Sequence, residues 1–231
     1  MRKVAVYVEG MTELVFVYHC IQAYYQSDWT AFHLDYVSVS PSDRIALMNR
    51  YGDETAENQF LLYNCGSDDS VIPTMKDRFQ AHLRQGYERI IGLQDVFGAR
   101  YFDVYKAGHQ QIEWDKVNAM IHDLEATVSQ LDASGTMQIR FSIMEIESWI
   151  LAMPHLLKEC FPGCPVDEVL TVNPEVSFVH PFNMLSSLVP YAKKFSTVEG
   201  IFSRITKAHL DTLLQSGKCP SFVRFFDCLF T

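Results

Sequence analysis

The sequence predicts an α/β protein with a mostly parallel central sheet, flanking helices and a helical C-terminal part. Short apolar runs rich in β-branched residues recur along the N-terminal part of the chain. Such runs are typical of strands buried on both faces of a parallel sheet. Segments with apolar residues at helical spacing separate these runs, and the C-terminal part contains several short helical patterns.

Five segments have the pattern of strands. The expected strands are Val4–Val8, Leu34–Val39, Phe60–Tyr63, Arg89–Leu93 and Met137–Ile143. Between the second and third of them, Ser40–Asn58 is expected to be a loop with a short helix at about Ile45–Asn49. Loops are also expected at Val96–Gly108, which is rich in aromatic residues, and at Phe161–Pro181, where prolines and a glycine interrupt any regular pattern.

Helical spacing marks the segments between and after the strands. The expected helices are Glu13–Tyr25, Val71–Gln85, Glu113–Leu131, Trp149–Leu157, Met184–Lys194, Val198–Arg204, His209–Gln215 and Pro220–Phe230. No stretch has the composition of a linker between domains. We therefore expect an α/β core at residues 1–160 and a helical extension at residues 161–231 that packs on the core in a single compact unit.

The composition narrows the class of protein. The chain has 231 residues, of which 48% are hydrophobic, and the formal net charge is −9. This negative charge argues against general electrostatic binding of nucleic acid. It does not argue against a nuclease, because bound cations would offset the negative charge of metal-binding carboxylates. Six cysteines lack the Cys-x-x-Cys spacing of a zinc site. Neither a signal peptide nor a membrane-length apolar run is found, so we expect a cytoplasmic protein without membrane association.

The first strand ends in the residue pattern of a ligand site. It leads into Glu9, Gly10 and Thr12, and Glu13 follows one helical turn after Glu9. Gly10 permits a sharp turn, and Thr12 is the expected N-cap of the next helix. Ligands bind at the carboxyl ends of strands in open α/β sheets, and two carboxylates there would suit Mg²⁺. The alternative is that Glu9 only caps the helix.

Further acids follow later strands. Asp95 comes directly after the fourth strand, and Glu145 and Glu147 come after the fifth. If the fifth strand extends to Glu147, both glutamates share a face; if a helix begins at Glu145, only one of them can reach the site. The alternative for this pair is a structural ion pair. Lys193 and Lys194 form the one adjacent lysine pair, which either stabilises charge on a phosphoryl group or lies in solvent at a helix end.

Three segments resemble a known family. The stretch VAVYVEGMTE is similar to the opening motif of TOPRIM domains, in the Glu-Gly-x-Thr-Glu form of OLD-family nucleases and of small bacterial TOPRIM-like proteins. FSIMEIESWILAM is similar to a Glu-x-Glu-aromatic-x-x-Leu-Ala segment of the latter proteins. YAKK and CPSFVRFFDCL resemble their lysine segment and closing helix. The resemblance implies a TOPRIM-like, Rossmann-like fold.

The resemblance also implies a Mg²⁺- or Mn²⁺-dependent nuclease that cleaves phosphodiester bonds. Glu9 and Glu13 would bind metal at the first strand, and Glu9 would be catalytic. Asp95 would be the first acid of the family's Asp-x-Asp motif. Glu147, with Glu145, would complete a second metal site. Lys193 or Lys194 would be the charge-stabilising lysine.

The sequence departs from the family at one position. The second acid of Asp-x-Asp is replaced by Phe97. Either Asp103 or Glu145 replaces the lost ligand, or a single metal binds, or activity is lost and the chain is a non-catalytic binding or regulatory subunit. At the family level we expect an effector of anti-phage defence that acts on DNA or RNA beside an ATPase partner, with a homodimer as a further expectation.

Overall fold

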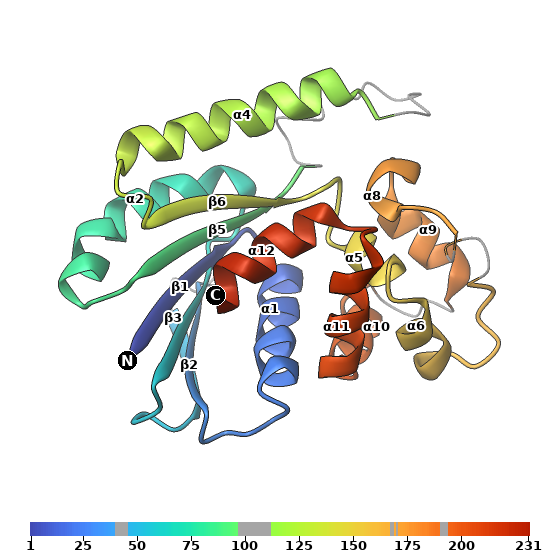
Figure 1. The fold of residues 1–231 in the computed structure, drawn as a ribbon, viewed down its shortest axis with the longest axis horizontal. Helices are drawn as coiled ribbons and strands as arrows, with labels where there is room; N and C mark the ends of the chain where they lie inside the picture. Colours follow the sequence, from blue (N-terminus) through green and yellow to red (C-terminus); the bar gives the residue numbers. More distant parts are fainter. Residues whose placement is uncertain (40–45, 97–111, 167–168, 170, 190–193) are drawn as a thin grey trace.

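The computed structural model describes residues 1–39, 46–96, 112–166, 169, 171–189 and 194–231. Six strands form one sheet in the order β3-β2-β4-β1-β5-β6 (Figure 1). The strands are β1 (Arg2–Val8), β2 (Phe32–Val39), β3 (Ala46–Gly52), β4 (Asn58–Asn64), β5 (Arg89–Asp95) and β6 (Met137–Ser142). All neighbouring strands are parallel except β2 and β3. The predicted fold class, an α/β fold with a mostly parallel sheet and a helical C-terminal part, is confirmed.

Strand β1 lies inside the sheet and separates two apolar cores. Its alternating side chains point to opposite faces. Val4, Val6 and Val8 belong to one core, whereas Ala5 and Tyr7 belong to the other, and all five are fully buried. This burial on both faces explains the continuous apolar run in the sequence. It also makes the end of β1 a fixed point from which Glu9 projects.

Helices cover both faces of the sheet (Figure 1). On one face, α2 (Asp68–Arg84) packs against β1 and β5, and α4 (Trp114–Leu131) packs against β6. On the other face, α1 (Met11–Tyr24) packs against β1 and β4, and α12 (Pro220–Phe230) packs against β5 and β6. None of the helices in the described ranges combines the length and the apolar character that crossing a bilayer requires.

The helical C-terminal part shares the core on the α1 face. Two short helices precede it, α5 (Glu147–Leu151) and α6 (Pro154–Cys160), and its own helices are α8 (Pro174–Ser177), α9 (Pro181–Leu188), α10 (Lys194–Phe202) and α11 (Lys207–Ser216), followed by α12. The ring of Phe16 in α1 lies 5.4 Å from the ring of Trp149 and 5.2 Å from that of Phe202, measured between centroids. The predicted division at residue 160 stays a prediction.

Four expectations about secondary structure are wrong. The single helix expected at Trp149–Leu157 is instead two helices, α5 and α6, because Pro154 begins a new helix. The loop expected at Phe161–Pro181 contains the short helix α8.

In the helix expected at Ile45–Asn49, the described residues 46–49 are instead part of strand β3, which pairs antiparallel with β2, a contact that no local pattern reveals. The helix expected at Met184–Lys194 is α9, which begins at Pro181 and ends at Leu188. Val189 has an extended backbone with ψ of 143°, as expected for a residue that precedes proline.

Candidate metal centre

The ends of β1 and β5 bring two acids together. These strands are adjacent and parallel, with Val8 opposite Leu93, so Glu9 and Asp95 emerge at the same edge of the sheet. The main-chain N–H of Asp95 donates a hydrogen bond to Oε2 of Glu9 over 3.1 Å. This bond fixes one oxygen of Glu9 beside Asp95.

Helix α1 supplies the third acid. The helix begins at Met11, and its N-cap is Gly10, with an extended backbone, rather than the expected Thr12. A Cβ atom on residue 10 would lie 3.0 Å from Oε2 of Glu13. Glycine at this position therefore leaves room for the carboxylate of Glu13. Glu13 is only 5% exposed.

The three carboxylates form a compact group. One oxygen from each of Glu9, Glu13 and Asp95 lies within 4.8 Å of the others. Within the described ranges this is the one group of three or more such side chains close enough to hold a metal ion. All three donors are carboxylate oxygens, the ligands that Mg²⁺ and Mn²⁺ prefer. The donor set therefore fits a hard divalent cation.

The electrostatics of Asp95 agree with this fit. The pKa of its carboxyl is raised well above the usual range: removal from water is the largest cause, and the charges of Glu13, Glu9 and Glu147 follow. A hydrogen bond from Ser142 acts in the opposite direction. Like charges held together in this way disfavour ionisation, and a bound cation would remove that penalty.

Glu145 and Glu147 diverge after β6. Helix α5 begins at Glu147, which is 2% exposed and whose charge acts on Asp95. Oε2 of Glu145 instead accepts the main-chain N–H of Phe182 over 2.8 Å, in the first turn of α9. Met144, between β6 and α5, has a left-handed backbone with φ of 65°, an unfavourable conformation for a non-glycine residue. The chain thus turns directly before Glu145, ahead of both acids.

No protein-family model, curated protein or solved structure matches this chain. The structure therefore establishes a mixed α/β domain with a mostly parallel six-stranded sheet and an acidic cluster that could hold a metal ion. The resemblance to TOPRIM domains stays an expectation from the sequence.

Several predicted site residues are not placed. Lys193, Phe97 and Asp103 lie outside the described residues, and so does the side chain of Lys194, the first residue of α10. The proposed roles of the two lysines, and of Asp103 as a replacement ligand, stay predictions.

Strand β6 contributes a residue that the sequence did not reveal. Ser142 is fully buried, and its Oγ donates a hydrogen bond to Oδ1 of Asp95. The two residues lie opposite each other in the pairing of β5 with β6. A serine at the end of a strand carries no distinctive signal in the sequence. Only the strand order brings it to the acid.

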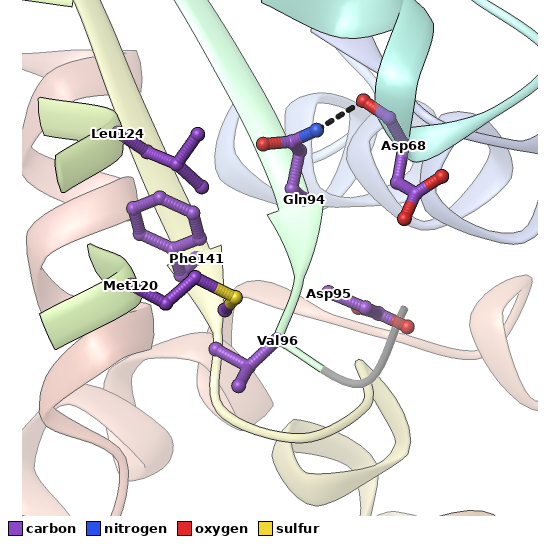
Figure 2. Close-up of a pocket in the computed structure, with 7 residues that line it drawn as sticks. All are labelled: Asp68, Gln94, Asp95, Val96, Met120, Leu124 and Phe141. Atoms are coloured by element: carbon purple, nitrogen blue, oxygen red, sulfur yellow. Dashed lines mark hydrogen bonds between the residues drawn. The ribbon is translucent and has the colours of Figure 1, made fainter. Parts of the chain in front are cut away.

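A small cavity borders Asp95 (Figure 2). Its volume is about 20 Å³, enough for about one water molecule. Gln94 and Asp68 contribute polar groups, and Nε2 of Gln94 donates to the main-chain oxygen of Asp68. The remaining wall is apolar and consists of Val96, Met120, Leu124 and Phe141. The Gln94 bond connects the end of β5 to the first turn of α2.

Proposed function

We propose that this protein is a metal-dependent nuclease and that Glu9, Glu13 and Asp95 are its metal ligands. The observation that supports this proposal is the convergence of the three carboxylates, each with an oxygen within 4.8 Å of the others, at the carboxyl edge of the sheet. This edge is where open α/β proteins bind ligands. The resemblance of the sequence motifs to those of TOPRIM domains points to the same chemistry.

The residues of the centre have distinct proposed roles. A bound Mg²⁺ or Mn²⁺ would supply Lewis acidity toward a phosphodiester and lower the pKa of a bound water. Glu9 and Asp95 would hold the cation from the ends of two neighbouring strands, and Glu13 would hold it from α1. Glu147 adds negative charge beside Asp95. Lys193 or Lys194 would stabilise charge on the phosphoryl group.

The wider biological role rests on the resemblance alone. We propose a cytoplasmic effector of anti-phage defence that cleaves DNA or RNA under the control of an ATPase partner. The net charge of −9 favours control by a partner, since it gives the protein little general attraction to nucleic acid. Phe97 favours a second candidate function, a non-catalytic binding or regulatory subunit.

Cleavage assays separate the two functions. Plasmid DNA and tRNA are incubated with wild type in Mg²⁺ or Mn²⁺, and with the Glu9→Gln variant. Glu88→Gln is the matched control, because Glu88 is exposed and precedes β5 at the end of the strand opposite to Asp95. A nuclease gives cleavage by wild type and the control, and none by Glu9→Gln or with EDTA. Equal inertness of all three proteins, with and without a candidate partner, would contradict the nuclease proposal.

A further inference from the structure

The carboxylate of Asp95 needs a fixed orientation to act as a metal ligand. Carboxylates can turn about their last side-chain bond, and metal ligands are commonly oriented by a hydrogen bond from a neighbouring group. In this protein the donor comes from β6. Asp95 and Ser142 lie opposite each other in the β5–β6 pairing, and the main-chain N–H of Val96 donates to the main-chain oxygen of Ser142 over 3.0 Å.

The pairing of β5 with β6 places the hydroxyl of Ser142 beside the carboxylate of Asp95. Ser142 is 0% exposed, and its Oγ donates to Oδ1 of Asp95. The main-chain N–H of Asp95 in turn donates to Oε2 of Glu9. A chain of two hydrogen bonds thus runs from β6 through Asp95 to Glu9, and each bond engages one oxygen of an acid of the centre.

We propose that Ser142 is a positioning residue of the metal centre, whose hydroxyl holds Oδ1 of Asp95 and thereby fixes the orientation of the carboxylate that would bind the cation. The inference rests on the proposed metal centre and extends it from the three ligands to the strand behind them. Removal of a group that orients a metal ligand typically weakens metal binding by about 10- to 100-fold. We expect a loss in this range when the hydroxyl is removed.

The test measures Mn²⁺ affinity by calorimetry on the full chain, with thermal unfolding of each protein as a check on folding. The variants are Ser142→Ala, which removes the donor, and Ser142→Thr, which keeps it. Ser148→Ala is the matched control: Ser148 is also 0% exposed, and its Oγ has no hydrogen-bond partner in the part of the chain that the structure describes. Ser142→Cys keeps the shape of the side chain and has a weaker donor.

The expected result is a 10- to 100-fold weaker affinity in Ser142→Ala, near wild-type affinity in Ser142→Thr and Ser148→Ala, and an intermediate value in Ser142→Cys. Equal affinity of wild type and Ser142→Ala would overturn the inference, as would equal losses in Ser142→Ala and Ser148→Ala. If Ser142→Ala does not fold, wild-type affinity in Ser142→Cys overturns it. Wild type that binds Mn²⁺ but cleaves no nucleic acid contradicts the nuclease proposal alone. Wild type that binds no Mn²⁺ contradicts both.

Discussion

The main-chain N–H of Asp95 donates to Oε2 of Glu9 over 3.1 Å and joins the ends of two neighbouring parallel strands. The bond sets the orientation of the Glu9 carboxylate through backbone geometry rather than through a flexible side chain. The side-chain hydroxyl of Ser142 in turn donates to the carboxylate of Asp95. The protein thus arranges two carboxylates close together although their mutual repulsion opposes it. Such preorganisation is the arrangement expected of a cation site.

The first prediction concerns the repulsion at Asp95. Because its pKa is raised in the folded protein, the folded state keeps a proton that the unfolded chain releases as the pH rises. The metal-free protein therefore loses stability as the pH rises above the usual carboxyl range. Acidification, which protonates Asp95, restores that stability. Asp95→Asn removes the ionisable group. We expect this variant, without metal, to be more stable than wild type at pH 8.

Bound metal should reverse the order of stability of wild type and Asp95→Asn. A cation that binds only the folded state adds about 2.7 kcal/mol of stability at a concentration of 100 times its Kd. Saturating Mn²⁺ should therefore raise the Tm of wild type, while the Tm of Asp95→Asn should stay nearly constant. Thermal unfolding at pH 8, with and without Mn²⁺, measures both effects. Equal Mn²⁺-induced shifts in the two proteins would contradict the assignment of Asp95 as a ligand.

The second prediction concerns His82, which is 4% exposed and shares a hydrogen bond with the hydroxyl of Tyr7 in β1. Burial lowers the pKa of His82 below its ordinary value of 6.5. The unfolded chain therefore takes up a proton near pH 6.5 that the folded protein does not, and stability falls as the pH drops below that value. Denaturant unfolding between pH 7.5 and 5 measures this loss.

The variant His82→Gln provides the comparison for this prediction. It removes the titrating group, so its stability should change less than that of wild type between pH 7.5 and 5. Tyr7→Phe removes the hydroxyl that faces the imidazole, and we expect it to lower the free energy of unfolding by about 1–3 kcal/mol at pH 7.5. An identical acid dependence in wild type and His82→Gln would exclude His82 as the cause.

Much of the candidate centre could be predicted from the sequence, for a physical reason. A strand buried on both faces leaves a recognisable apolar run, and an acid at its end is easy to see. Glu9 and Asp95 both follow such runs. Their meeting depends on β1 and β5 being neighbours in the sheet, which the pattern of each strand alone does not determine.

Other features depend on pairing and backbone geometry. Strand β3 lacks a strong local pattern and is defined by its contact with β2. Ser142 matters only because it lies opposite Asp95 in the register of β5 and β6. Glu145 lies before helix α5 and Glu147 begins it, while the left-handed backbone of Met144 turns the chain between β6 and both acids, and a methionine gives no sign of such a turn. Single-residue patterns cannot supply information of this kind.

The third prediction tests the β2–β3 hairpin through a glycine. Gly52 has φ of 81°, and a Cβ atom there would lie 2.1 Å from the main-chain oxygen of Phe32. Gly86 has a similar φ of 78°, but a Cβ atom on it meets nothing within 4 Å. Gly86→Ala should therefore lose only the left-handed preference of glycine, about 1–2 kcal/mol.

Gly52→Ala should lose more than Gly86→Ala, because a backbone carbonyl cannot move aside as a flexible side chain can. We expect an additional loss of about 1–3 kcal/mol, the usual range for overpacking. Denaturant unfolding of both variants measures the difference. Equal losses in the two variants would show that the close approach of residue 52 to β2 does not occur in solution.

The fourth prediction separates the two glutamates that follow β6. Glu147 is buried and its charge acts on Asp95, whereas Glu145 accepts the N–H of Phe182 at the start of α9. Glu147→Gln removes negative charge beside the cation site, and we expect Mn²⁺ affinity to fall by about tenfold or more, the scale seen when groups next to metal ligands are lost.

Glu145→Gln is the matched substitution, because it makes the same chemical change two residues away and keeps an oxygen that can accept the Phe182 N–H. We expect its Mn²⁺ affinity and its stability to remain close to those of wild type. Glu145→Ala removes the acceptor and should lower stability by about 0.5–2 kcal/mol, as for the loss of a helix N-cap, again without weakening Mn²⁺ binding. Calorimetry and denaturant unfolding on the three variants give both quantities. A loss of Mn²⁺ affinity in Glu145→Gln as large as that in Glu147→Gln would place Glu145 within the metal centre. This result would agree with the ligand role that the motif resemblance implies. It would contradict the view that the contact with α9 is the main role of Glu145.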